Sequence, residues 1–356
     1  MPTFCRHNRF VEKCPICSKA ERTRPGTMGE ASGGAAGARR PTPARPERVG
    51  GPGRRRSPRS AGNLVVRRQA RAVEDGYEED LVPGLRASAD AAALAAELAW
   101  AWGRLEELGS SPSGAYAEAA SLEDREEALW LAFQLAVLDP ADGDLGSARV
   151  TWASGDVPDV AGVERGPRGS ADPVKTFAAY RTWAVRVGSQ AAGLAGDPAW
   201  TPQRRFDRAY ERLSLGALQR EPRYEFLVVA GRLGLVDAEP GGLWLSDSHS
   251  PVVGAAKRVF GIGDPLLLAR RAADLAAAAE MPIAAFDLGL QNWARAGQGR
   301  LAGGSAQGEE PRADLVRPIA SALRVAVPEV EGDAAGQADA DVASEDVDGP
   351  APDPQS

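Results

Sequence analysis

The chain has 356 residues, of which 43% are hydrophobic and 26% are charged, and its formal net charge is −7. This length allows two or three domains, and the balance of residue types is typical of a soluble protein with a hydrophobic core. No apolar run reaches the roughly 18 residues that a transmembrane helix needs, which argues against membrane partners. The first residues are charged and lack the apolar stretch of a secretory signal, so we expect a cytoplasmic protein.

Residues 1–20 contain all three cysteines of the chain and one of its two histidines. Cys5, His7, Cys14 and Cys17 follow the pattern Cys-x-His-x6-Cys-x2-Cys. Zinc binds four sulfur or nitrogen ligands in a tetrahedron, and Cys-x-x-Cys places two thiolates on one tight turn. The pattern therefore predicts a small module folded around a structural Zn²⁺, with no open position for a substrate. A redox-active Cys-x-x-Cys or three free thiols are the alternatives.

Residues 21–85 are rich in Gly, Pro, Ser and Arg. Between Arg22 and Arg71 there are thirteen Arg, against only Glu30 and Glu47. So few apolar residues cannot offset the entropy lost on ordering, so we expect a disordered linker. Two interpretations of its arginines stay open. They attract DNA phosphates without sequence preference, or they reflect a GC-rich genome and the segment is only a spacer.

Residues 86–300 show the periodicity of amphipathic helices, broken by short loops, and long alternating β patterns are absent. The pattern predicts an α fold class, an irregular helical bundle that follows the zinc module and the linker. The expected helices cover 87–108, 121–138, 172–194, 201–213, 221–235, 251–263, 264–281 and 283–295.

Two of these expected helices meet at the sequence VFGIGDPLLLA, residues 259–269. A helix-hairpin-helix motif consists of a helix, a turn with the pattern apolar-Gly-apolar-Gly, and a second helix. Gly261, Ile262 and Gly263 are expected to turn tightly and expose backbone N–H groups, which bind a DNA phosphate without sequence preference. The alternative is a plain turn between helices. The cations that flank the hairpin and suit DNA binding are Lys257, Arg258, Arg270 and Arg271.

An aspartate follows the hairpin, in EMPIAAFDLGLQNWARAG. In the helix-hairpin-helix DNA glycosylases, an Asp in a similar position faces the flipped base and stabilises positive charge that develops on the sugar. Asp287 is the candidate for that role here, although its interval from the hairpin is a few residues longer than in those enzymes. The alternative is an N-cap of the last expected helix. No Lys lies between the hairpin and Asp287, which argues against the Schiff-base variant of that superfamily.

Residues 301–356 return to Gly, Ala and acids. Nine Asp or Glu and no Lys or Arg follow Arg324. We expect a disordered, acidic tail here, so the four predicted segments are 1–20, 21–85, 86–300 and 301–356.

The segments FCRHNRFVEKCPIC, RRFDRAYERL, PRYEFLVVAGRLGL, AAKRVFGIGDPLLLARRAADLA and PIAAFDLGLQNW resemble the bacterial alpha-glutamyl/putrescinyl thymine pyrophosphorylase family, in particular its third clade. The resemblance covers roughly residues 1–20 and 86–300. It implies a relative of the helix-hairpin-helix DNA glycosylases that attaches an amine, such as glutamate or putrescine, to pyrophosphorylated hydroxymethyluracil in DNA. By resemblance, Gly261, Ile262 and Gly263 grip the DNA and Asp287 is the active-site acid.

A base inside a duplex must be extruded before such chemistry. Five aromatic residues are candidates for stacking on it, although helical aromatics usually pack inward: Trp183, Phe206, Tyr210, Tyr224 and Trp293. A set of arginines in the same region suits pyrophosphate or the DNA backbone, or it forms a solvated face: Arg204, Arg205, Arg208, Arg220 and Arg223.

The leading hypothesis is therefore a DNA base-modifying enzyme with DNA and a small amine as partners and structural zinc as cofactor. The alternative is a non-catalytic, zinc-containing DNA-binding or adaptor protein. A third reading is a zinc-stabilised protein-interaction module unrelated to DNA.

Overall fold

A computed structural model of the chain describes residues 72–140, 143–303 and 310–327. All of these residues belong to one compact unit. In those residues every regular element is a helix and no strand occurs, which confirms the α class for this part of the chain. None of the helices in the described ranges is both long and apolar enough to cross a bilayer.

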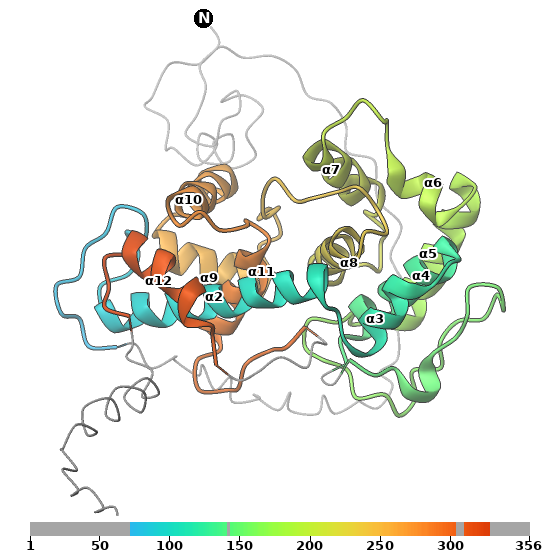
Figure 1. Cartoon of the computed structure of the whole chain (residues 1–356), viewed down its shortest axis with the longest axis horizontal. Coiled ribbons are helices and arrows are strands. Elements are labelled where there is room, and N and C mark those ends of the chain that lie inside the picture. Colours follow the sequence, from blue (N-terminus) through green and yellow to red (C-terminus); the bar gives the residue numbers. More distant parts are fainter. Residues whose placement is uncertain (1–71, 141–142, 304–309, 328–356) are drawn as a thin grey trace, which may run out of the picture. The chain divides into compact units, whose positions relative to one another are not determined.

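The helices follow one another along the chain from blue to red in Figure 1. They are α2 (Ser88–Ser110), α3 (Gly114–Ser121), α4 (Arg125–Leu138), a short 3-10 turn η2 (Gly146–Ala148), α5 (Pro173–Val187), α6 (Gln190–Ala195), α7 (Pro202–Arg212), α8 (Arg220–Arg232), α9 (Pro251–Phe260), α10 (Pro265–Ala278), α11 (Ala285–Ala294) and α12 (Ala313–Ala322).

Four of these helices share one start signal, a capping side chain followed by proline. The pairs are Asp172-Pro173, Thr201-Pro202, Ser250-Pro251 and Asp264-Pro265, and each capping oxygen accepts a hydrogen bond from a backbone N–H of the first turn. The cap satisfies a donor that has no partner inside the helix, and proline needs no acceptor at the first position. These starts are therefore fixed locally by the sequence.

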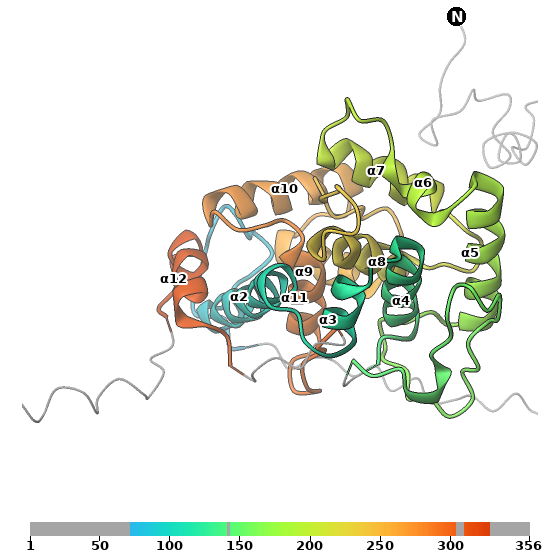
Figure 2. The same cartoon turned by 45° about the vertical axis from the view of Figure 1, so that its right-hand side comes forward.

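The helices form two groups (Figures 1 and 2). The α2 group consists of α2, α9, α10, α11 and α12, in which α2 packs against both α11 and α12. The α8 group consists of α3 to α8, in which α8 packs against α4 and α7. Helices α2 and α8 contact one another across the two groups. Any residue between α2, α8 and α11 therefore lies where the two groups meet.

The α8 group is held by a cluster of aromatic rings. Phe133 stacks on Tyr180 with ring centroids 3.6 Å apart, and Phe226 meets Phe133 edge-on at 5.1 Å. All three rings are fully buried. Such rings bury large apolar areas and restrict one another's orientation, which fixes α4, α5 and α8 relative to one another.

The observed helices differ from the expected ones at three places. The expected helix 172–194 is broken at Gly188, which has φ +98°, and continues as the separate helix α6. Helix α3 lies in a stretch where no helix was expected. Helix α12 lies inside residues 301–356, which were assigned to the acidic tail; its buried Leu315 and Ile319 pack on α2. The helical domain therefore extends past residue 300.

The N-terminal boundary of this domain also shifts. Residues 72–85 were assigned to the linker, but Val82 and Leu85 are buried in the core. Gly84 donates its N–H to Val259 O at 2.9 Å, at the end of α9. A Cβ at Gly84 would lie 2.0 Å from Arg258 O, so only glycine permits this approach.

Candidate active site

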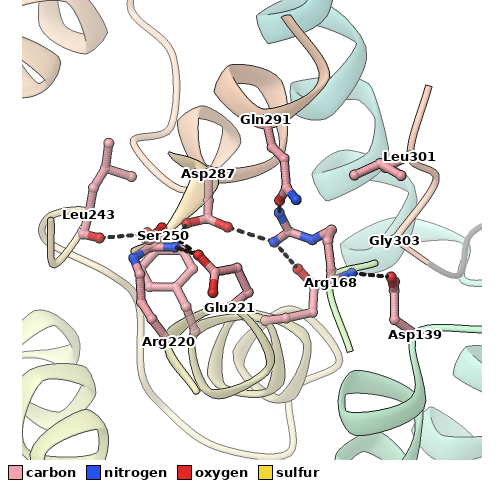
Figure 3. Close-up of polar contacts among 12 residues, drawn as sticks. Asp139, Arg168, Arg220, Glu221, Leu243, Ser250, Asp287, Gln291, Leu301 and Gly303 are labelled. Carbon is pink, nitrogen blue, oxygen red and sulfur yellow. Dashed lines mark hydrogen bonds and ion pairs between the residues drawn. The ribbon is translucent and has the colours of Figure 1, made fainter. Parts of the chain in front are cut away.

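Asp287 lies in the first turn of α11, and its carboxylate is held by two arginines (Figure 3). Its Oδ1 accepts a hydrogen bond from Arg168 Nη2 at 2.6 Å, and its Oδ2 lies 2.5 Å from Arg220 Nη1. The second contact is an ion pair without the alignment of a hydrogen bond. The side chain of Asp287 is 3% exposed. The N-cap of α11 is Ala284, so Asp287 serves the arginines and does not cap the helix.

Arg168 reaches this position from a loop that crosses the end of α4. Gly166 donates its N–H to Asp139 O at 2.8 Å, and Arg168 donates its own backbone N–H to Asp139 Oδ2 at 2.9 Å. Asp139 is in the left-handed region with φ 48°, which turns its carboxylate toward the loop. A Cβ at Gly166 would lie 2.1 Å from Asp139 Oδ2. The loop can therefore deliver Arg168 only because residue 166 is glycine.

The ionic contacts continue from Arg168 to a second carboxylate. Arg168 Nη2 lies 3.2 Å from Glu225 Oε2, and the other oxygen of Glu225 accepts from Arg104 of α2. Arg104 also donates to Gly303 O at 2.7 Å, and Tyr116 donates its hydroxyl to the same carbonyl at 2.8 Å. All of these side chains are buried. A chain of alternating charges thus runs from α11 through the loop and α8 to α2.

Arg220 extends the contacts in the other direction. It donates to the carbonyl of Leu243 and, through Nε, to the carbonyl of Trp244 at 3.2 Å. Its neighbour Glu221 accepts a hydrogen bond from the hydroxyl of Ser250, the cap of α9 (Figure 3). Arg220 therefore links Asp287 to the backbone of the loop between α8 and α9.

The network balances its charges. Three arginines face three acids in it: Arg104, Arg168 and Arg220 with Glu221, Glu225 and Asp287. A buried charge is tolerated only with a partner, and removal of one partner from such a pair typically costs about 3–5 kcal/mol. Members of the network come from both helix groups, since Arg104 and Asp287 belong to the α2 group and Arg220 and Glu225 to the α8 group. The network therefore couples the two groups.

Two acids that contact Arg168 have opposite pKa shifts. Burial acts to raise the pKa of Asp287, but the charges of Arg220 and Arg168 outweigh it and hold the pKa below its ordinary value. For Asp139, burial outweighs both the charge of Arg168 and the hydrogen bond from its backbone N–H, and so raises the pKa. Asp287 is therefore an anion in the folded protein. It can accept a proton or stabilise a cation, and it cannot donate a proton.

The hairpin predicted from the sequence is a turn between α9 and α10. Gly261 has φ +66° and donates its N–H to Lys257 O at 3.0 Å, so this N–H is used as the cap of α9. The N–H groups of Ile262 and Gly263 donate to no atom of the described residues. Asp264 caps α10 and accepts from Leu266 N and Leu267 N at 2.9 and 3.0 Å. Two free backbone donors thus remain at the tip of the turn.

The cations around this turn have different surroundings. Arg258 packs on the ring of Trp293, with its guanidinium carbon 4.5 Å from the ring centroid. Arg271 donates to Asp80 O at 3.0 Å. Lys257 is half-buried and Arg270 exposed, and neither forms an ion pair with a described residue. The structure brings Lys257, Arg258 and the free N–H groups to one turn, whereas Asp287 belongs to the buried network.

The five aromatic candidates are all core residues, and each is at most 5% exposed. The five arginines do not gather into one cationic surface. Arg204 packs on Trp200, Arg205 pairs with Asp237, Arg208 with Glu211, and Arg220 with Asp287. Arg223 packs on Tyr210, with its guanidinium carbon 3.9 Å from the ring centroid.

The predicted zinc ligands Cys5, His7, Cys14 and Cys17 lie outside the described residues. In the ranges that are described, no group of three or more His, Cys, Asp or Glu side chains is arranged to hold a metal ion. The zinc site stays a prediction from the sequence.

Comparison with known proteins gives one finding. Residues 170–278 match the family model of alpha-glutamyl/putrescinyl thymine pyrophosphorylase clade 3. No curated protein and no solved structure matches the chain significantly. The matched residues hold α5 to α10, including Arg220, Glu225 and the turn at Gly261, and they leave out Arg168 and Asp287. The resemblance to this thymine pyrophosphorylase family that the sequence indicated is confirmed, over the helices from α5 to α10.

Proposed function

We propose that this protein is an enzyme that modifies a base in DNA, with hydroxymethyluracil in its pyrophosphorylated form as substrate. It attaches an amine, such as glutamate or putrescine, to that base and releases pyrophosphate. The observation that carries the proposal is the family match over residues 170–278. The match covers most of the α8 group together with α9 and α10. It therefore includes the turn at Gly261 and Arg220, one of the two arginines that pair with Asp287.

The proposed reaction is a substitution at the exocyclic carbon of the base. The amine nitrogen forms a bond to this carbon while the carbon–oxygen bond to pyrophosphate breaks, and the bonding electrons leave with the pyrophosphate. The amine gives up a proton. Such a reaction needs cations beside the departing anion and an acceptor for the proton. Arg168, Arg220 and the ionised Asp287 are groups of these kinds, and each arginine lies within 2.6 Å of Asp287.

Asp287 is the proposed active-site carboxylate of this centre. Its side chain is 3% exposed, and both its oxygens face arginines. An extruded base can therefore reach it only after Arg168 or Arg220 exchanges its contact with Asp287 for one with the substrate. The network lies where the α2 and α8 groups meet, so a small separation of the groups provides that access.

We further propose that α9, the turn and α10 act as a helix-hairpin-helix on the DNA backbone. Ile262 and Gly263 offer free N–H groups, and Lys257 and Arg270 offer cations without ion-pair partners among the described residues. These groups contact phosphates, which position the duplex without reading its sequence.

The reaction is tested on duplex DNA that contains hydroxymethyluracil or its pyrophosphate. The protein is incubated with this DNA and with glutamate, putrescine or no amine, and the nucleosides are then analysed by mass spectrometry. We expect the mass of an amine-substituted nucleoside and release of pyrophosphate. Absence of any new nucleoside with every amine, while the DNA is still bound, would favour the non-catalytic DNA-binding or adaptor protein.

The role of Asp287 is tested with Asp287→Asn, at a temperature at which circular dichroism shows the variant to be folded. We expect product formation to be lost. The matched control is Glu97→Gln, which removes an ion pair with Arg300, at 2.8 and 2.9 Å, away from the network. If Asp287→Asn is as active as the wild type, Asp287 has no role in the reaction.

For the N-terminal residues we propose a structural zinc module held by Cys5, His7, Cys14 and Cys17. Zinc is measured in the purified protein by elemental analysis. We expect one Zn²⁺ per chain and loss of the metal in Cys14→Ser. A protein free of zinc, or a Cys14→Ser variant that keeps its zinc, would rule the module out.

A further inference from the structure

Trp244 lies in the loop between α8 and α9. Arg220 contacts both this loop and Asp287. Its backbone has φ +50°, a left-handed conformation that is unfavourable for any residue with a Cβ. Its neighbours Leu243 and Leu245 are buried, whereas Trp244 itself is half-buried. The conformation thus brings a large aromatic ring toward the surface between two anchored residues. Strained positions of this kind concentrate at functional sites.

Three successive carbonyls hold the loop in this conformation, and all three accept from side chains of α8. Tyr224 donates its hydroxyl to Gly242 O at 3.1 Å. Arg220 donates to Leu243 O and, at 3.2 Å, to Trp244 O. Figure 3 shows Arg220 between Leu243 and Asp287. The position of Trp244 is therefore fixed relative to Asp287 through a single buried side chain.

The indole of Trp244 lies among polar and aromatic groups of α7 and α8. Its Nε1 donates to Asp207 Oδ1 at 3.2 Å, and its ring centroid is 4.6 Å from that of Tyr210. Arg223 packs on Tyr210 and donates to its hydroxyl at 3.0 Å. The Nε of Arg223 is buried and has no hydrogen-bond partner among the described residues. A held aromatic ring beside an incompletely bonded cation is the combination that binds a nucleobase and its phosphate.

We propose that Trp244 stacks on a nucleobase of the DNA substrate and that Arg220 sets its position relative to Asp287. This inference rests on the proposed function, because it takes DNA as the ligand. Arg223 contributes positive charge beside the stacked base. Trp200 is the control residue for Trp244. It is also half-buried, and the guanidinium carbon of Arg204 lies 4.9 Å from the centroid of its ring. Trp200 lacks the left-handed backbone and the tie to Arg220.

The test is the binding of a labelled, single-stranded oligothymidylate to the full chain, followed by fluorescence anisotropy. Loss of one base–aromatic stack weakens binding by about 5- to 150-fold, and we expect this range for Trp244→Ala. Trp244→Phe keeps a stacking ring and is expected to keep most of the affinity. Trp200→Ala is expected to bind like the wild type. Equal affinities of Trp244→Ala and the wild type, or equal losses in Trp244→Ala and Trp200→Ala, would overturn the proposal.

A second measurement covers the case in which Trp244→Ala does not fold. Stacking quenches indole fluorescence, so the oligonucleotide should quench the wild type more than it quenches Trp244→Phe. Identical quenching of the two proteins would also refute the proposal. Failure of the enzymatic reaction gives a different result. If the oligonucleotide quenches Trp244 and Trp244→Ala binds weakly while no modified nucleoside forms, the stacking role of Trp244 is supported and the proposed reaction is refuted.

Discussion

The buried network at Asp287 and the turn at Gly261 were both expected to act on DNA, and the structure builds them in opposite ways. In the network, each charged side chain faces an opposite charge, and the pairs of Arg104 with Glu225 and of Arg168 and Arg220 with Asp287 join distant parts of the chain. At the turn, two backbone donors have no partner in the described residues, and two cations have no ion pair there. Groups that satisfy one another hold the fold, and groups left unsatisfied at the surface are available to a ligand.

This difference makes the two sites separable by measurement. Changes in the network should alter the free energy of unfolding strongly, because they leave buried charges without partners. Changes at the turn should leave that free energy nearly unaltered and should alter only the binding of DNA. The experiments below sharpen or break this contrast.

The largest effect is expected for Asp287→Ala. The substitution leaves Arg168 and Arg220 buried without their shared carboxylate, which should lower the free energy of unfolding by about 3–5 kcal/mol. Urea denaturation followed by circular dichroism measures it. A loss below about 1 kcal/mol would show that the arginines find other partners and that the network does not hold the fold.

A smaller but still marked effect is expected for Gly166→Ala. The new methyl group would lie 2.1 Å from Asp139 Oδ2 and 2.2 Å from Asp139 O, so the loop that carries Arg168 must shift. Overpacking of this kind costs about 1–3 kcal/mol. Gly263→Ala at the turn is the matched control, because nothing lies within 4 Å of the added Cβ. Similar stabilities of the two variants would contradict the contrast between the sites.

The two acids beside Arg168 should shift the pH dependence of stability in opposite directions. The folded-state pKa of Asp287 is below its ordinary value of 3.8, so its stabilisation is present above that pH and is lost as the pH falls through the lower, folded-state pKa. The folded-state pKa of Asp139 is raised, so its ionisation destabilises the protein as the pH rises from 3.8 through the folded-state pKa.

This prediction is measured by urea unfolding between about pH 3 and pH 7. Asp287→Asn should lose less stability on acidification than the wild type. Asp139→Asn should lose more, and it should be no less stable than the wild type at neutral pH, because Asn keeps the acceptor for Arg168 N and tolerates the left-handed backbone. Parallel pH profiles of the three proteins would show that neither pKa is shifted by folding.

The smallest effect on stability is expected at the turn. Lys257→Ala combined with Arg270→Ala should leave unfolding unchanged within about 0.5 kcal/mol. If both cations contact phosphates, the slope of log affinity for DNA against log salt should fall by about 1 for each cation removed. Lys175→Ala is the control, since Lys175 is an exposed lysine that pairs with Asp172. If the slope of log affinity against log salt is unchanged, the cations of the turn do not contact DNA.

The helices could largely be predicted from the sequence, because their start signals are local. Thr201-Pro202 and Pro173 identify helix starts within a few residues. Helix α12 was missed because it contains Pro318 and follows a Gly-rich stretch, although Leu315, Val316 and Ile319 are spaced as on one helical face. Helix α3 is a short, Ala-rich segment whose burial depends on contact with α4.

The candidate site could be predicted only in part. Asp287 was singled out, but its partner Arg168 lies 119 residues earlier in the chain and outside any expected helix. A local signal existed in RGPRGS, where two glycines flank an arginine and permit close approach of the loop to α4. Glu225 was also detectable, as an acid within the apolar run YEFLVV of a buried helix. The pairing of acids with arginines depends on how the helix groups pack. The local sequence contains no information about that pairing.

The path of the chain through the two helix groups has a consequence for synthesis on the ribosome. The α8 group is continuous, from Gly114 to Arg232, and can pack as soon as α8 has emerged. The α2 group joins α2 to the last four helices of the described residues, and such distant contacts form late because closing the intervening chain costs entropy. Arg168 and Arg220 are made before Asp287. A nascent chain therefore holds these two cations beside Glu225 and Glu221 of α8, but without the carboxylate that they share, until α11 appears.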